Sequence, residues 1–114
     1  MANQTINVAV TCVNGTTSCS NNIINVRQPK NSQITINWNV SNGTFPSNLN
    51  SAFSWKAGFT GSGNLTRVND GQIQLVYNIQ TSGTWKYNIT LNSCATFDPE
   101  IVNEVPPGDE EPPR

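Results

Sequence analysis

The sequence predicts an all-β fold, an antiparallel Greek-key β-sandwich of about seven or eight strands, and three observations lead to this prediction. Apolar and polar residues alternate with a period of two in several short runs, as in strands that are buried on one side. Clusters of Asn, Asp, Gly and Pro separate these runs. No run shows the 3.6-residue apolar period of a capped helix. Short strands joined by turns bury their apolar faces most simply in two packed layers.

Three strands are expected in the first part of the chain. INVAVTC, at residues 6–12, alternates and predicts a strand with one buried side. NIINVRQP, at 22–29, is short, and Pro29 ends it because proline lacks a backbone donor, so we expect an edge strand or one that switches between sheets. QITINWNVS, at 33–41, alternates most regularly and has Trp38 on its apolar side.

A loop and a fourth strand follow. NGTFPSNLN, at residues 42–50, has the composition of a loop, with Asn42-Gly43 suited to a left-handed turn. Alternation resumes in AFSWKAGF, at 52–59, and the glycines of TGSGN then interrupt it.

The last part of the chain contains a predicted hairpin and two more strands. NLTRVNDGQIQLVYNIQ, at residues 64–80, is expected to turn at Asp70-Gly71, a pair that supplies positive φ in tight turns. SGTWKYNITL, at 82–91, alternates again. EIVNEV, at 100–105, predicts a short final strand before the prolines that follow.

The chain length of 114 residues fits one domain, which we place at residues 1–105. Residues 106–114, PPGDEEPPR, lack apolar residues and predict a flexible, acidic, Pro-rich tail. Residues 1–97 carry five cations and one anion, whereas residues 98–114 carry six acids and one arginine. The cations do not cluster, so binding to nucleic acid is not expected.

The composition favours a protein outside the cytoplasm. Only 11% of the residues are charged, and Asn, Ser and Thr supply most of the polarity. The N-terminus MANQTINVAV does not have the form of a signal peptide, which leaves a cytoplasmic location as the alternative. No apolar stretch approaches the ~18 residues of a membrane span, so membrane insertion is not expected.

The three cysteines leave two hypotheses open. Cys12 and Cys19 flank VNGTTS, a turn-like segment that could bring their Cα atoms within the ~7 Å that a disulfide needs. The alternative is three reduced, partly buried thiols. The spacing of Cys12, Cys19 and Cys94 without any histidine does not predict a zinc site.

The absence of histidine also bears on catalysis. It excludes Ser-His-Asp and Cys-His nucleophilic pairs and proton transfer by imidazole at neutral pH. Six of the seven acids lie in the last 17 residues, which argues against a pair of catalytic carboxylates. We therefore expect a protein that is not an enzyme and that holds no cofactor or metal.

Two stretches resemble strands of cupredoxins and of immunoglobulin-like sandwiches. INVRQPKNSQITINWNV is similar to the paired early strands of cupredoxins, and SGTWKYNITL resembles the late strand that precedes their copper-binding cysteine. Ile89 stands about where that cysteine would be expected, and type 1 copper needs imidazole ligands that this chain does not have. The resemblance therefore implies a sandwich architecture without electron transfer.

The expected function is non-catalytic binding or assembly with a protein or a surface polymer, through end loops at residues 42–50 and 58–64 or through a sheet edge. The oligomeric state is not predicted. The candidate loop contacts are Phe45, Asn48, Phe59, Asn64 and Phe97.

Two alternative functions stay open. One is a small cytoplasmic regulator or inhibitor that uses its acidic tail. The other is a carbohydrate-binding module in which Trp38, Trp55 and Trp85 stack on sugars, although their alternation with aliphatic residues favours core packing.

Overall fold

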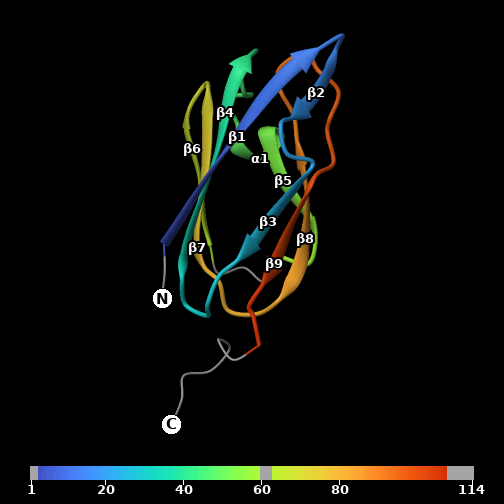
Figure 1. Ribbon diagram of the computed structural model, residues 1–114. Helices are drawn as coiled ribbons and strands as arrows, with labels where there is room; N and C mark the ends of the chain where they lie inside the picture. Colours follow the sequence, from blue (N-terminus) through green and yellow to red (C-terminus); the bar gives the residue numbers. More distant parts are fainter. Residues whose placement is uncertain (1–2, 60–62, 108–114) are drawn as a thin grey trace.

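The chain folds into two β-sheets packed face to face (Figure 1). The computed structural model describes residues 3–59 and 63–107, which form nine strands and one short helix. The larger sheet has the order β2 (Thr16–Cys19), β1 (Asn3–Val13), β4 (Gln33–Asn42), β7 (Gln72–Asn78) and β6 (Asn64–Asn69). The smaller sheet has the order β3 (Ile23–Arg27), β9 (Glu100–Glu104), β8 (Gly83–Ile89) and β5 (Phe53–Ala57). The predicted all-β sandwich is confirmed.

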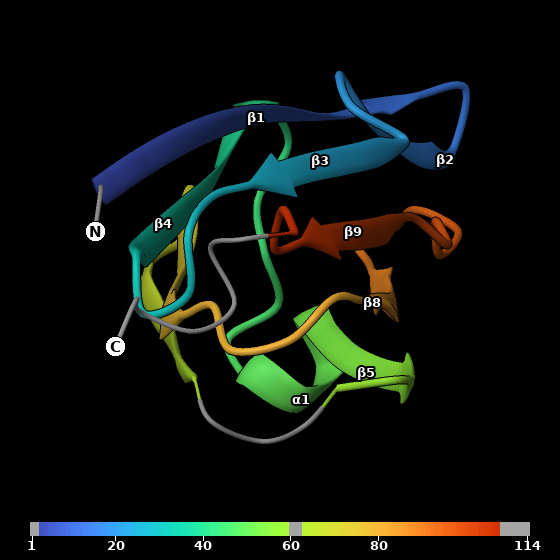
Figure 2. The ribbon, with the colours of Figure 1, turned by 60° about the horizontal axis from the view of Figure 1, so that its bottom comes forward.

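Figure 2 shows the strands of the two sheets as two layers, and the buried apolar residues form one core between them. Alternate residues of the central strands point inward, so the period of two in the sequence becomes one buried and one outer face. Trp38 of β4 is fully buried, and its indole nitrogen donates a hydrogen bond to the hydroxyl of Tyr87 in β8 at 3.0 Å. This bond satisfies the buried indole N–H and links the two sheets.

Both sheets are mixed, and the expectation of wholly antiparallel pairing is wrong. β1 pairs with β4 in parallel, and β3 pairs with β9 in parallel, whereas the other pairs are antiparallel. Parallel neighbours need a long connection between them. Here β2 and β3 separate β1 from β4 in the sequence, and β4 to β8 separate β3 from β9. Local alternation carries no information about pairing between such distant strands.

Several predicted elements are confirmed. β3 is an edge strand of its sheet, and β6 and β7 form the predicted antiparallel hairpin. Strand β9 follows at residues 100–104. Gly43 has the left-handed conformation expected of Asn42-Gly43, with φ of 112°.

Strand β2 was not predicted. It forms a hairpin with β1 through Asn14 and Gly15, which have φ of 53° and 74°. These values match the Asn-Gly type of tight turn. Asp70 and Gly71 connect β6 to β7 as expected, but neither has a positive φ, so the predicted conformation of this pair is wrong. The Asn-Gly pair in VNGT was therefore the signal for the additional strand.

The predicted loop at 42–50 runs into a single helical turn, α1 (Leu49–Ala52). The side chain of Asn48 caps it by accepting a hydrogen bond from the backbone nitrogen of Asn50 at 2.9 Å. One turn is too short to show a 3.6-residue apolar period, which explains why the sequence did not predict it.

The disulfide joins Cys12 to Cys94, so both hypotheses drawn from the sequence, a Cys12–Cys19 bond and three reduced thiols, are wrong. Cys12 lies opposite Thr17 in the β1–β2 hairpin, whereas Cys19 lies opposite Val10. The two cysteines of the hairpin are thus at different levels of the ladder. Cys94, 82 residues away in the sequence, comes within 6.2 Å of Cys12 between Cα atoms, and Cys19 keeps a free, half-buried thiol.

Candidate functional site

The two outer faces of the sandwich differ in their charge. On the smaller sheet, Lys86 of β8 lies opposite Glu100 of β9 in the strand register. Arg27 of β3 forms an ion pair with Glu104 of β9 at 2.8 Å. Lys56 of β5 adds a further pair with Asp98 at 3.6 Å. This face therefore carries charges of both signs that compensate each other.

The outer face of the larger sheet carries no charged side chain. All five of its strands lie within the described residues, and Arg67 of β6 is their only charged residue. Its guanidinium donates hydrogen bonds to the carbonyl oxygens of Pro46 at 2.8 Å and Phe45 at 3.2 Å, and it also pairs with Asp70. Arg67 lies opposite the buried Ile73 in the register, so it belongs to the inner side of the sheet and not to the outer face. Its side chain is 18% exposed, and its hydrogen bonds reach the loop at 42–50.

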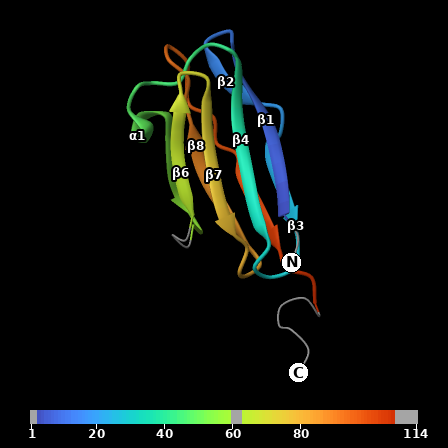
Figure 3. The same cartoon turned by 90° about the vertical axis from the view of Figure 1, so that its left-hand side faces the viewer.

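Amide and hydroxyl side chains cover this uncharged face instead. Figure 3 views it from outside, with β6, β7, β4 and β1 side by side. We call it the amide face. Its outward residues on the two central strands are Gln33, Thr35, Asn37 and Asn39 of β4 and Gln72, Gln74, Val76 and Asn78 of β7.

A hydrogen-bond network fixes the centre of the amide face. Asn7, Asn37 and Gln74 lie side by side in the register of β1, β4 and β7. The amide nitrogen of Asn37 donates to Asn7 at 3.2 Å, and its oxygen accepts from Gln74 at 2.9 Å and from Gln72 at 3.2 Å. Within the described part of the chain, the other ends of the Asn7, Gln72 and Gln74 amides form no further hydrogen bond. Oriented donors and acceptors therefore remain for a partner.

A hollow of about 360 Å³ lies toward one end of the same face. Its lining comes from β4, β7 and β6 and from the turn after β7, and it holds no charged residue. The lining residues are Gln33, Asn64, Val76, Tyr77, Asn78 and Gln80. Four amide side chains around one apolar residue, Val76, form a neutral polar recess.

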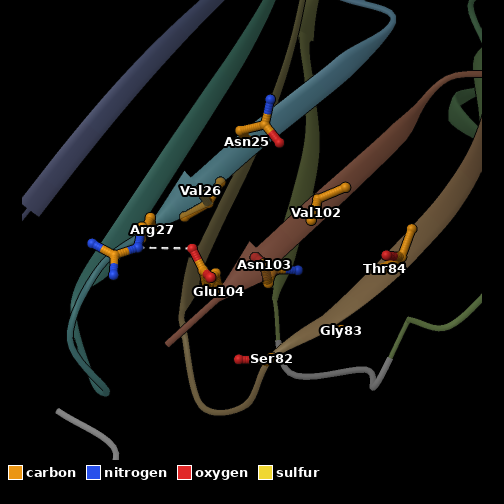
Figure 4. A pocket seen from close by; sticks show the side chains of 9 residues that line it. All are labelled: Asn25, Val26, Arg27, Ser82, Gly83, Thr84, Val102, Asn103 and Glu104. Atoms are coloured by element: carbon orange, nitrogen blue, oxygen red, sulfur yellow. Dashed lines mark hydrogen bonds and ion pairs between the residues drawn. The ribbon is translucent and has the colours of Figure 1, made fainter. Parts of the chain in front are cut away.

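A second hollow, of about 560 Å³, lies on the smaller sheet between β3, β9 and the start of β8 (Figure 4). Arg27 and Glu104 lie on its rim and pair with each other, and their side chains are 64% and 55% exposed. A charged pair in water is well solvated, and covering it costs desolvation free energy. This hollow is therefore a less favourable contact surface than the amide face.

The loop residues expected to contact a partner do not gather at one place. The loop at 42–50 leads into α1, whereas the end of β5 and the start of β6, which flank the second loop, lie farther toward the opposite end of the sandwich (Figures 1 and 3). Residues 60–62 of that second loop lie outside the described residues. The described parts of the two loops therefore do not lie together as one surface.

Of the individual loop residues, Phe45 requires a correction. It is 1% exposed and belongs to the core, because apolar contact outweighs its position in a polar loop. Phe59 is half-buried, with its ring stacked on Trp55 at 4.0 Å between centroids. Phe97 is half-buried and pairs with Ile89 through backbone bonds. Asn48 caps α1. Asn64 lines the hollow on the amide face, and the other four loop residues line neither of the two hollows described above.

The tryptophans do not form a flat exposed platform. Trp38 and Trp85 are buried, as the alternation favoured, and Trp55 is partly exposed against Phe59. A sugar-stacking surface of three tryptophans is therefore not present in this arrangement.

The four outermost strands of the two sheets, β2, β6, β3 and β5, are poorly suited to accept a partner strand. β2 has four residues, and β3 has five. The register of β5 shifts between Trp55 and Ala57, and that of β6 shifts between Arg67 and Asn69. Short and bulged edge strands are devices that hinder strand addition. The edges formed by these four strands are thus less favourable contact surfaces than the amide face.

The cysteines and acids do not assemble a reactive site in the described part of the chain. No three of the Cys, Asp and Glu residues described there lie together as metal ligands. Burial raises the pKa of the Cys19 thiol to about 12, which keeps it protonated at neutral pH.

Among the described residues, no helix has the length and apolar character needed to cross a membrane. The tail from residue 108 onward lies outside the described residues.

The sequence matches no protein-family model and no curated protein. The function proposed below therefore depends on the geometry of the chain itself.

Proposed function

We propose that this chain is a non-catalytic binding module that holds a neutral, hydroxyl-rich polysaccharide against its amide face. The observation that carries the proposal is the contrast between this uncharged face and the ion-paired opposite face. Removing charges from water is costly, so surfaces that become covered on binding are depleted of them. A polymer of hydroxyl groups matches both the donors and the acceptors of Asn and Gln side chains.

A protein partner fits the amide face less well. The cores of protein interfaces are enriched in aromatic residues, methionine and arginine. The outward positions of β4 and β7 include Val76 but no aromatic residue. The hydrogen-bonded amides around Asn37 instead resemble the small number of oriented polar groups with which sites recognise polar ligands.

We also propose that the module acts outside the cytoplasm. The disulfide between Cys12 and Cys94 supports this location, because disulfides persist in oxidising compartments. The two-layer β architecture supports the resemblance to immunoglobulin-like and cupredoxin-like sandwiches, which stays a prediction for this chain.

The experiment is retention of the purified protein on insoluble cellulose, mannan, xylan and chitin. We expect retention on at least one of these polymers, and we expect it to persist in 1 M NaCl, because no charge on the face can be screened. Replacement Asn37→Asp should reduce retention at least tenfold, since it places a charge at the centre of the face. The new carboxylate can still accept from Gln72 and Gln74, so the sheet should remain folded.

A matched control is Asn25→Asp, which makes the same change at an exposed position of β3 in the other sheet. It should leave retention unchanged. Retention on none of the four polymers, or equal losses in both variants, would contradict the proposed function.

A further inference from the structure

We infer that the polysaccharide is an extended, unbranched chain that lies along β4 and β7, with one sugar ring seated in the hollow beside Asn64 and Asn78. This inference rests on the proposed function and adds the direction and the class of the polymer.

The direction follows from the register of the two central strands. Three successive outward pairs form a lane, namely Gln33 with Asn78, Thr35 with Val76, and Asn37 with Gln74. The hollow lies at the first of these pairs and the amide network at the third. Both features lie on the same two strands at different levels, so a ligand must run along the strands to reach both.

The length of the lane sets the class of polymer. Gln33 and Asn37 are four residues apart on β4, which corresponds to roughly 13 Å in an antiparallel ladder. A single sugar cannot span this distance. A helical polysaccharide curves away from a lane of this kind, whereas an extended chain stays in contact along it.

The middle of the lane suits the less polar face of a sugar ring. Val76 is half-buried beside Thr35. The Thr35 hydroxyl forms no hydrogen bond with another described residue. The C–H groups of a ring can pack on the valine, while its edge hydroxyls face the amides of neighbouring strands. Asn64 of β6 lies opposite Val76 in the register and closes the hollow on that side.

The experiment measures binding of soluble oligosaccharides to ¹⁵N-labelled protein by NMR titration. The probes are hexasaccharides of β-1,4-linked glucose, mannose, xylose and N-acetylglucosamine, their disaccharides, and maltohexaose as a helical control. At least one extended hexasaccharide should bind tenfold or more tightly than its disaccharide. Its shift changes should run from Asn64 and Asn78 to Asn37, and maltohexaose should bind at least tenfold more weakly.

Two variants separate this inference from the proposed function. The double replacement Asn64→Asp with Asn78→Asp changes two exposed residues of the hollow and should lower the affinity for the hexasaccharide about tenfold. Asn25→Asp should have no effect. Hexasaccharide binding that is sensitive to Asn37→Asp but unaffected by the double replacement would overturn the subsite and leave the proposed function standing.

The remaining outcomes are also decisive. Binding of maltohexaose as tight as that of the extended chains would overturn the claim of an extended polymer. Absence of any oligosaccharide binding, together with no retention on the insoluble polymers, would overturn both proposals.

Discussion

The hydroxyl of Tyr77 donates a hydrogen bond to the side-chain oxygen of Asn103 across the interior of the sandwich, with 2.6 Å between the two oxygens. Tyr77 belongs to β7 of the larger sheet and Asn103 to β9 of the smaller one, so the contact joins the two layers. The Asn103 side chain is buried, with the residue 2% exposed, and its amide nitrogen has no partner among the described residues. The Asn103 amide therefore has a hydrogen bond at its oxygen but none at its nitrogen among the described residues. A buried polar atom without a hydrogen bond is uncommon in protein interiors.

Replacement of Tyr77 by Phe should lower the free energy of unfolding by about 1–3 kcal/mol, because it leaves both polar atoms of the buried Asn103 amide without a partner. The double replacement Tyr77→Phe with Asn103→Leu removes the tyrosine hydroxyl and the buried amide together. Its free energy of unfolding should lie closer to that of the wild type than the sum of the single losses predicts. Urea denaturation of the wild type, Tyr77→Phe, Asn103→Leu and the double variant checks this. Strictly additive losses in the free energy of unfolding would show that the two groups are not coupled.

Removal of the disulfide with Cys12→Ala and Cys94→Ala should reduce the free energy of unfolding by about 2–5 kcal/mol, because the bond closes a long loop across 82 residues. Thermal and urea denaturation measure the loss. In the wild type, alkylation after denaturation without reductant should label one thiol, Cys19, and labelling after reduction should reach three. Three labelled thiols without reductant in protein from its native host would refute the pairing.

The stability of the fold should decrease in alkaline solution partly because of Cys19. Burial raises the pKa of its thiol from 9.0 to about 12, so between these values the unfolded chain has released the proton and the folded chain retains it. The unfolded state then binds fewer protons, and the free energy of unfolding falls as pH rises. The contribution is fully present below pH 9 and lost by about pH 12.

The comparison with Cys19→Ala isolates this contribution. Burial also raises the pKa of Tyr77 and Tyr87, so both proteins should lose stability above pH 10, but the variant should show a shallower decline between pH 9 and 10. Urea denaturation in steps of pH gives the two slopes. Identical slopes would mean that the thiol does not titrate differently in the folded and unfolded chains.

Much of the fold could be predicted because strand formation has a local cause. Alternation in QITINWNVS placed Trp38 in the core, and Pro29 ended the edge strand before it. The β6–β7 hairpin was predicted from the pair Asp70-Gly71, and it forms although neither residue has the expected positive φ. The β1–β2 hairpin was missed although Asn14-Gly15 marked it, because TTSC is too short to show a clear period.

The amide face could be predicted only in part. The polar side of the strand at 33–41 was visible as Thr35, Asn37 and Asn39, but its neighbours were not. The network exists because β1 lies beside β4 in parallel and β7 on the other side, which brings Asn7 and Gln74 next to Asn37. Asn7 and Asn37 are 30 positions apart in the sequence, and Asn37 and Gln74 are 37 apart. Packing of the whole domain brings them together.

Local patterns in the sequence predicted every strand except β2, together with the buried sides of the strands, because alternation, turn residues and proline act over a few neighbouring positions. Three features became visible only in the folded chain: Cys94 is the partner of Cys12, Phe45 enters the core, and the strands of only one sheet carry ion pairs on their outer face. The physical reason is that these features depend on which distant strands pair and in what register. That choice minimises the free energy of the whole packed core and leaves no signature in a short window of sequence.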